Sequence, residues 1–169
     1  MERAKLVIFK AIEQDKSVPM VTIFNSGMHI DTPIQPPEAT TLMVACSIGS
    51  TEITKTILGL GPDVNAKDKI GRTALHFACR RGSLEHFSIL SELEDIDLDA
   101  QSNSGVTALM MAVHSGNIKL VAACLNANMN PFLKDGLERT AVDYAAQFTD
   151  VLGVDVRLLI TQAMDQWRD

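Results

Sequence analysis

The apolar positions of this chain follow a short helical pattern that recurs at a nearly constant distance. A threonine is followed two residues later by leucine or valine, and three residues after that by alanine, so the two apolar side chains share one face of a helix. The pattern starts at Thr40, Thr73, Thr107 and Thr140, which lie 33, 34 and 33 residues apart. Self-similarity at such a period predicts a chain built from stacked repeats of one supersecondary unit.

The pattern predicts the same elements in each unit. The threonine hydroxyl is expected to accept a hydrogen bond from a free backbone N–H of the first helical turn. Gly49, Gly82 and Gly116 follow the alanine by four residues and are predicted to end the helix in the left-handed conformation, whereas Thr149 stands there in the last unit. A second apolar helix follows, and then a loop with a turn such as that at 68–71. Each unit is thus predicted to contain two helices and a protruding loop.

The two ends of the chain are predicted to hold atypical units. Ala11 precedes Ala45 by 34 residues, so the stretch 1–14 is interpreted as the first helix. The last helix is expected to run from about Val154 to Ala163. End units are expected to differ because they turn one face to water. The chain is interpreted as one domain, residues 1–169, with units at approximately 1–34, 35–67, 68–100, 101–134 and 135–169.

Residues 62–85, PDVNAKDKIGRTALHFACRRGSLE, resemble the ankyrin repeat consensus almost position for position. The flanking units match it more loosely, and together they cover about the whole chain. The resemblance implies an all-α ankyrin-repeat solenoid of stacked helix-turn-helix units with protruding β-hairpin-like loops. Two loops are expected to deviate from it. The first, at 31–38, is rich in proline, and the last has Glu138 in place of the tip glycine, with Gly136 coming early.

Composition narrows the classes of function. The 169 residues are 46% hydrophobic and carry a formal net charge of −6, which argues for a globular protein and against a general nucleic-acid binder. No run approaches the roughly 18 apolar residues of a membrane span, and the stretch 1–14 makes a poor signal peptide. Three cysteines without paired spacing favour a reducing compartment, so we expect a cytoplasmic and/or nuclear protein.

Candidate residues for catalysis or metal binding are few. Cys46 and Cys79 hold the same place in two units, and Cys124 lies on a second helix, so all three are predicted to be core residues. Zinc would need about four ligands with paired spacing, so we expect no metal and no cofactor. No nucleophile elbow, Walker loop or dinucleotide motif is present, and the acidic run 92–99 is interpreted as a solvated loop. We therefore expect a protein that is not an enzyme, since an enzyme would need a catalytic constellation that the sequence lacks.

Five individual residues stand out beside the repeat pattern. His76 falls at the histidine position of the ankyrin consensus, and the resemblance implies that it ties neighbouring loops together by hydrogen bonds. His86 and His114 are interpreted as surface residues, with His114 the stronger candidate for a partner contact. Asn65 resembles the asparagine that ankyrin repeats offer to asparaginyl hydroxylation. Trp167 is expected to pack over the terminal cap, with a projecting anchor as the alternative.

The resemblance implies that a protein partner binds the loop tips and the concave face of the first helices. The positions that carry over are Lys69, Ile70, Arg72, Arg80, Arg81, Asn103, Ser104, Val106, His114, Ser115, Leu137, Arg139 and Phe148, with Ser47, Ile48 and Gln147 beside them. Ile70, Val106 and Leu137 predict an apolar stripe across three successive loops. The set contains five cations and no acid, which indicates an acidic partner segment with apolar anchors.

The same arginines allow two other interpretations. Arg80 and Arg81 stand at the C-terminal end of a helix, where cations favour the negative end of the dipole without any partner. RNA binding is the weaker interpretation, because no stacking aromatic residues accompany them. The sequence therefore leaves the purpose of this basic pair open.

The pattern and the resemblance together predict a protein–protein interaction module. We expect it to be monomeric by itself and to bind one specific partner as a small adaptor or inhibitor. The alternative is a constitutive, non-catalytic subunit of a larger assembly, which would expose a larger apolar face. No further domain is expected within these residues, and neither nucleic acid nor membrane insertion is expected.

Overall fold

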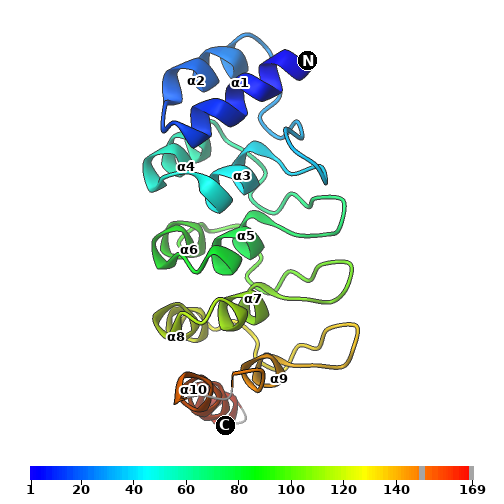
Figure 1. Cartoon of the computed structure of the whole chain (residues 1–169), viewed down its shortest axis with the longest axis vertical. Coiled ribbons are helices and arrows are strands. Elements are labelled where there is room, and N and C mark those ends of the chain that lie inside the picture. Colours follow the sequence, from blue (N-terminus) through cyan, green and yellow to red (C-terminus); the bar gives the residue numbers. More distant parts are fainter. Residues whose placement is uncertain (149–150, 168–169) are drawn as a thin grey trace.

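The computed structural model describes residues 1–148 and 151–167 as a stack of helix pairs (Figure 1). From the first layer to the last, the pairs are α1 (Glu2–Glu13) with α2 (Ser17–Asn25), α3 (Thr41–Ile48) with α4 (Thr51–Leu58), α5 (Ala74–Arg81) with α6 (Leu84–Ser91), α7 (Ala108–His114) with α8 (Ile118–Asn126), and α9 (Ala141–Ala145) with α10 (Val151–Gln166). The described residues contain no strand, so the predicted all-α solenoid is confirmed. Within those residues, no helix has both the length and the apolar character that crossing a membrane requires.

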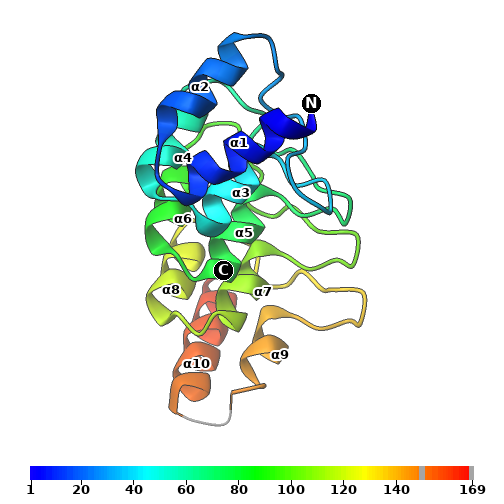
Figure 2. The same cartoon turned by 45° about the horizontal axis from the view of Figure 1, so that its top comes forward.

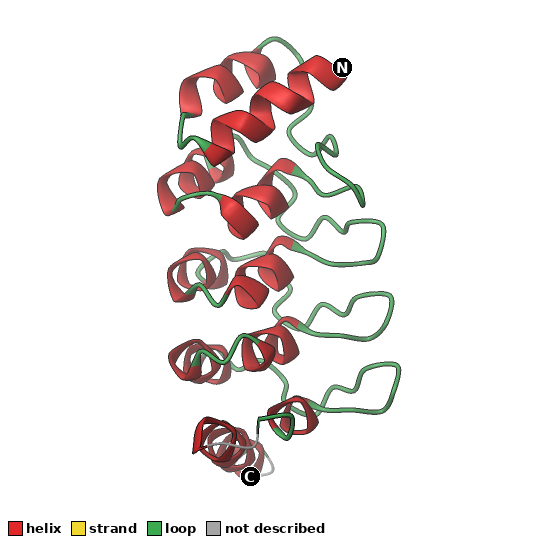
Figure 3. Cartoon of the chain, viewed as in Figure 1, coloured by secondary structure: helices red, strands yellow, loops and turns green. Residues whose placement is uncertain are grey.

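The helices form two columns, and the loops leave the stack on one side. The odd-numbered helices α1 to α9, here called the inner helices, lie next to the protruding loops, and the even-numbered outer helices lie behind them (Figure 2). The loops project side by side from the helical body (Figure 3). Four loops close on themselves through backbone hydrogen bonds, and we call them finger A (34–39), finger B (68–72), finger C (102–106) and finger D (135–139).

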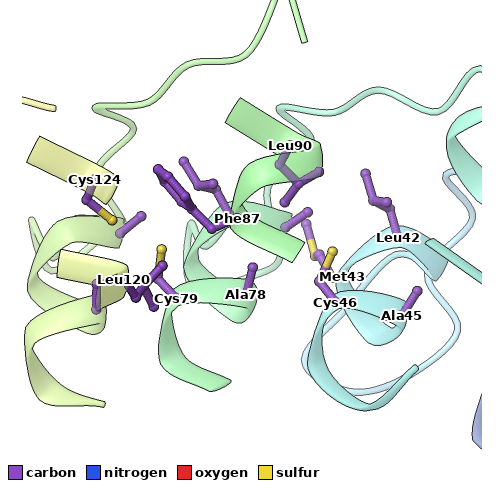
Figure 4. Close-up of a cluster of buried hydrophobic side chains, with 14 of the residues drawn as sticks. Leu42, Met43, Ala45, Cys46, Ala78, Cys79, Phe87, Leu90, Leu120 and Cys124 are labelled. Atoms are coloured by element: carbon purple, nitrogen blue, oxygen red, sulfur yellow. The ribbon is translucent and has the colours of Figure 1, made fainter. Parts of the chain in front are cut away.

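A continuous hydrophobic core joins the layers. The repeat alanines Ala45, Ala78, Ala112 and Ala145 are fully buried, and their small side chains let each inner helix contact the next along the stack. Larger side chains such as Phe87 fill the space between inner and outer helices (Figure 4). The regular spacing of a small residue at the helix contact is therefore a packing requirement of the stack.

The threonine that precedes each inner helix from α3 to α9 is bonded to the side chain three residues later. In each case that side chain accepts a hydrogen bond from the threonine N–H. The acceptors are Met43 Sδ at 3.4 Å, His76 Nδ1 at 3.2 Å, Met110 Sδ at 3.5 Å and Asp143 Oδ2 at 2.7 Å. The predicted hydroxyl cap occurs at Thr40 and Thr107, whereas the hydroxyls of Thr73 and Thr140 bond the acceptor side chain instead. A thioether sulfur, an imidazole nitrogen and a carboxylate oxygen can each occupy this position, because each can accept a hydrogen bond.

Gly49 is not left-handed, contrary to the sequence-based expectation. Gly82 and Gly116 have φ values of 75° and 74°, but Gly49 has φ −77° and ψ 175°. A Cβ at Gly49 would lie 2.9 Å from the carbonyl oxygen of Ala45 and 3.1 Å from Cγ2 of Ile12. The absence of a side chain at Gly49 thus serves the close packing of α3 against α1. Thr149, the counterpart in the last unit, lies outside the described residues.

The last finger keeps the geometry of the others although its glycine is displaced. Glu138 adopts φ 61°, in the same left-handed region as Gly71 at 82° and Gly105 at 75°. The N–H of Asp135 donates to the Arg139 carbonyl at 2.9 Å, as in finger B, so the expected deviation does not occur. Finger A does deviate, as predicted from its prolines, because its closing bond spans one residue more, from Ile34 to Ala39.

Candidate functional site

Backbone hydrogen bonds join neighbouring fingers into a ladder. In each rung, an N–H of one finger donates to a carbonyl oxygen of the preceding finger. The rungs run from Lys69 to Pro37 at 2.9 Å, from Asn103 to Ile70 at 2.9 Å and from Gly136 to Ser104 at 2.7 Å. This ladder fixes the register, so Pro37, Ile70, Ser104 and Leu137 hold equivalent places at the four fingertips.

The register interrupts the predicted apolar stripe. The carbonyl of Val106 accepts the N–H of Ser102 at 3.0 Å, just as the carbonyls of Arg72 and Arg139 accept the closing N–H of their own fingers. Val106 thus takes the place of those arginines and packs half-buried against the core. Ser104 stands at the fingertip between Ile70 and Leu137, so the three apolar residues do not form one line.

Arg72 is fixed inside finger B. Its Nη2 lies 2.7 Å from Oδ2 of Asp68, whose carboxylate is fully covered, and its Nε donates to the same oxygen at 2.8 Å. The guanidinium also lies over the ring of Phe77, 4.5 Å from the centroid. The charge of Arg72 is therefore neutralised within its own finger, and its side chain is largely covered.

Finger D repeats this arrangement with Asp135, Arg139 and Tyr144. Nη2 of Arg139 lies 2.7 Å from Oδ2 of Asp135, and the hydroxyl of Tyr144 donates to that oxygen at 2.9 Å. Burial by itself raises the pKa of Asp135, but hydrogen bonds from Arg139, Tyr144 and the Leu137 N–H outweigh it and hold the pKa well below its usual range. The finger is thus held by an ionised carboxylate at neutral pH.

Most of the predicted cations on this surface have a partner within the described residues. Besides the pairs of Arg72 and Arg139, Nζ of Lys69 lies 3.8 Å from the carboxylate of Glu38 in the neighbouring finger. Nη1 of Arg81 donates to the carbonyl of Gly49 at 2.6 Å and so joins two layers. The Arg80 side chain is exposed and makes no hydrogen bond or ion pair with the described residues, so it is the free cation of the predicted set.

The remaining predicted residues divide into fixed and open positions. Asn103 uses its side-chain amide on the carbonyl of Lys69 at 3.1 Å, and the Ser115 hydroxyl donates to the backbone one turn earlier. Phe148 is half-buried against the core. Among the fingertips and the helix ends beside them, Ile70, Arg80, Ser104, His114 and Leu137 stay open to a partner, and we call them the open residues. Ile48 and Gln147 are exposed as well.

Sequence reasoning missed the N-terminal part of the surface. A hollow of about 370 Å³ lies between α1 and finger A and is lined by Glu2, Lys5, Ile34 and Lys69, among others. When Ala11 is aligned with its counterpart Ala45, α1 begins five residues earlier than α3. The first turn of α1 therefore extends over finger A. The atypical length of α1 could not be read from a repeat pattern that the first unit follows only weakly.

His76 has the structural role that the resemblance implies. Its Nδ1 accepts the N–H of Thr73, and its Nε2 donates to the carbonyl of Val106 in the next finger at 2.9 Å. His114 is exposed, as predicted. His86 is only 3% exposed, so the prediction of a surface residue is wrong. His86 lies three residues after the serine that caps its helix, and the buried Ile53 holds the same position in the preceding layer. An alignment of the outer helices would therefore have predicted that His86 is buried.

The buried histidines make the stability of the chain sensitive to acid. Burial lowers the pKa of His76 and of His86 below 6.5, and the charge of Arg81 lowers that of His86 further. Below about pH 6.5 these histidines bind protons more readily in the unfolded chain than in the folded chain. The free energy of unfolding is therefore expected to fall as the pH drops below about 6.5. Each site contributes at most about 1.4 kcal/mol per pH unit.

Urea titrations at a series of pH values measure this effect. His86→Gln is expected to make the loss of stability below about pH 6.5 shallower. His114→Gln, at an exposed position, is the matched control and is expected to keep the wild-type slope. Equal slopes for wild type and His86→Gln would contradict the assignment of His86 as a buried neutral group.

The cysteines are core residues, as predicted. All three are buried, and burial raises the pKa of the Cys46 thiol to about 12, so it stays protonated at neutral pH. Among the described residues, no three side chains of His, Cys, Asp or Glu are grouped as a metal ion requires. The three thiols thus contribute to the packing of the stack.

Asn65 and Trp167 take positions that bear on their predicted roles. The Asn65 side chain donates to the carbonyl of Asp95 at 2.6 Å and accepts the N–H of Asp97 at 2.8 Å, so it links neighbouring layers. Its hydroxylation stays a prediction. Trp167, just beyond α10, is 44% exposed, and both its packing over the terminal cap and its use as an anchor stay predictions.

Comparison with known proteins agrees with this architecture. A family model of ankyrin repeats in three copies matches residues 8–102, and one of ankyrin repeats in many copies matches residues 89–145. Neurogenic locus notch homolog protein 1 of Danio rerio is 28% identical over 140 residues, which are 82% of this chain and 6% of that protein. Neurogenic locus notch homolog protein 2 of Homo sapiens is 31% identical over 110 residues, 65% of this chain and 4% of that protein. The chain spans only a small part of these relatives, but the matches and the stacked helix pairs show that it belongs to the ankyrin repeat family, whose repeats mediate protein–protein interaction.

Proposed function

We propose that this chain binds one specific protein partner across the fingertips and the exposed ends of the inner helices, as a small adaptor or inhibitor. The observation that carries the proposal is the contrast between fixed and open side chains on this face. Arg72, Arg81 and Arg139 are held by internal bonds, whereas Arg80 projects without a partner among the described residues. A rigid frame that leaves a few side chains free is suited to recognition, because little conformational entropy is lost on binding.

The open residues define the chemistry of the partner. Ile70 is 45% exposed and Leu137 is 72% exposed, which offers apolar contacts at two fingertips. Arg80 offers a single free cation, because the other predicted cations of this face are paired or bonded internally. The partner therefore needs one acidic group and apolar anchors, and a long acidic stretch would find few free charges.

A constitutive subunit is the second candidate. It is favoured by apolar side chains exposed at both ends of the stack, with Val18 at 74% and Leu158 at 55% exposure. Such side chains suit a permanent interface better than a reversible one. For either use we place the chain in the cytoplasm or nucleus, a proposal supported by three cysteines that are all free thiols.

The double variant Ile70→Asp with Arg80→Glu tests the proposed surface. Both side chains are exposed, so thermal stability is expected to stay near that of the wild type. The tagged chain is used to recover its partner from its own cells, and the partner is quantified by mass spectrometry. Recovery is expected to fall by at least about tenfold, because one change removes an apolar anchor and the other reverses a charge.

Lys119→Glu is the control for charge, since Lys119 is an exposed cation on α8, away from the fingers. It is expected to leave partner recovery unchanged. A partner retained by the double variant would move the interface away from the open residues and favour the subunit interpretation.

A further inference from the structure

The basic pair Arg80 and Arg81 is only half explained by the fold. Nη1 of Arg81 donates to the carbonyl of Gly49, whereas the Arg80 side chain is exposed and makes no hydrogen bond or ion pair with the described residues. In the neighbouring layers, α3 and α7 end without a Lys or Arg at these places, which are held by Ser47 with Ile48 and by His114 with Ser115. The stack does not require two cations at a helix end, so the pair indicates a second use.

Ser83 follows the pair after one glycine and caps α6. Arg80 and Arg81 thus stand three and two residues before a serine, and the apolar Leu84 follows it. Protein kinases that prefer basic substrates select such a serine, because acidic side chains of their substrate groove pair with the guanidinium groups. No other serine or threonine of the chain has a Lys or Arg both two and three residues before it.

The Ser83 hydroxyl lies in the turn between α5 and α6, at the surface of the stack. The residue is half-buried, and its hydroxyl donates to Oε2 of the exposed Glu85 at 3.0 Å. The backbone of Ser83 is already extended, with φ −87° and ψ 106°. The N–H groups of Gly82 and Ser83 close the turn on carbonyls of α5 at 3.0 and 3.2 Å. Opening such a turn costs less than unfolding the whole chain, so a kinase can reach the segment 80–84.

The folded chain holds a cation where a phosphate on Ser83 would stand. Nδ1 of His86 lies 2.8 Å from Oγ of Ser83, and besides burial, the charge of Arg81 lowers the pKa of His86. The Arg81 guanidinium therefore acts on the surroundings of this hydroxyl. A phosphate there competes with the neutral carbonyl of Gly49 for Arg81, and hydrogen bonds between two charged groups are the stronger ones.

We propose that Ser83 is the phosphorylation site of a protein kinase that selects basic substrates. The serine Oγ bonds to the γ-phosphorus of Mg-ATP while the bond from that phosphorus to the bridging oxygen breaks. ADP leaves, and the hydroxyl proton passes to the catalytic carboxylate of the kinase. Arg80 binds the kinase, and Arg81 then pairs with the phosphate and releases the Gly49 carbonyl, which loosens the contact between the second and third layers. This site does not depend on the partner proposed above.

The folded full chain is incubated with Mg-ATP and the catalytic subunit of cyclic-AMP-dependent protein kinase as the probe, and mass spectrometry follows the reaction. One phosphate is expected, on Ser83. Arg80→Gln is expected to lower the initial rate by at least about tenfold, because the kinase loses one guanidinium group. Lys119→Gln removes an exposed cation from α8 and is expected to keep the wild-type rate. Ser50, which caps α4 without preceding cations, is expected to stay unmodified.

Phosphorus NMR tests the pairing with Arg81 in the phosphorylated chain. The second pKa of phosphoserine is about 6. It is expected to be lower in the folded chain than in the same chain unfolded in urea, because the guanidinium favours the doubly charged phosphate. Equal pKa values in the two states would contradict the release of Gly49 by Arg81.

Two outcomes would overturn the site itself. The first is a folded chain that takes up no phosphate on Ser83. If a synthetic peptide of residues 77–87 is phosphorylated beside it, the fold protects the serine. The second is an Arg80→Gln variant that is phosphorylated as fast as the wild type, since the basic pair would then not direct the kinase.

Discussion

Leu75→Ala is expected to lower the free energy of unfolding by about 2–5 kcal/mol. Leu75 is fully buried on α5, the central inner helix, which contacts α3 and α7 on either side. The neighbouring helices are already held in close contact by the repeat alanines, so they cannot move inward to refill the cavity. Urea titration followed by circular dichroism measures the change, and the transition is expected to remain a single cooperative step.

Arg80→Ala is the control for this prediction. The Arg80 side chain is exposed and makes no hydrogen bond or ion pair with the described residues, so its loss is expected to change the free energy of unfolding by less than about 0.5 kcal/mol. A larger loss would show that Arg80 supports the fold, and it would remove Arg80 from the open residues.

Gly105→Ala is expected to destabilise the chain by about 2–4 kcal/mol, through backbone strain and a steric clash together. Gly105 has φ +75°, a conformation that L side chains rarely adopt. A Cβ there would lie 2.9 Å from Cα of Asp135 and 3.0 Å from the N of Gly136, both backbone atoms of finger D. Because backbone cannot rotate away, the rung between fingers C and D must lengthen or break.

Gly61→Ala separates the two contributions. Gly61 has a similar φ of +72°, but a Cβ there would meet nothing within 4 Å. Its cost is expected to be that of strain alone, about 1–2 kcal/mol. Both free energies of unfolding are measured by urea titration. If Gly61→Ala and Gly105→Ala lower the free energy of unfolding equally, the close approach of fingers C and D adds nothing to the cost of Gly105→Ala.

Part of the site was within reach of the sequence. Asp68 and Arg72 lie four residues apart, as do Asp135 and Arg139, and this shared spacing could have predicted that both arginines are paired within their own loops. The partner of Lys69 could not be found in this way. Glu38 lies in a different finger, and only the ladder brings the two side chains together.

The sequence by itself determined the repeat period, the two helices of each unit and the small residue at each helix contact. These features depend on neighbours three or four residues apart along a helix, and a repeated pattern displays them several times. The caps at Thr40 and Thr107 could be assigned in this way because each bond is local to one unit.

Only the tertiary structure decided which surface residues are free. The ladder that sets the fingertips in register joins Ile70 to Asn103 and Ser104 to Gly136, residues about one repeat apart. Arg81 is tied to Gly49, while its neighbour Arg80 is left open. These contacts depend on how far one layer is shifted and turned against the next. That geometry results from the packing of whole helices and is not encoded in the pattern of any single repeat.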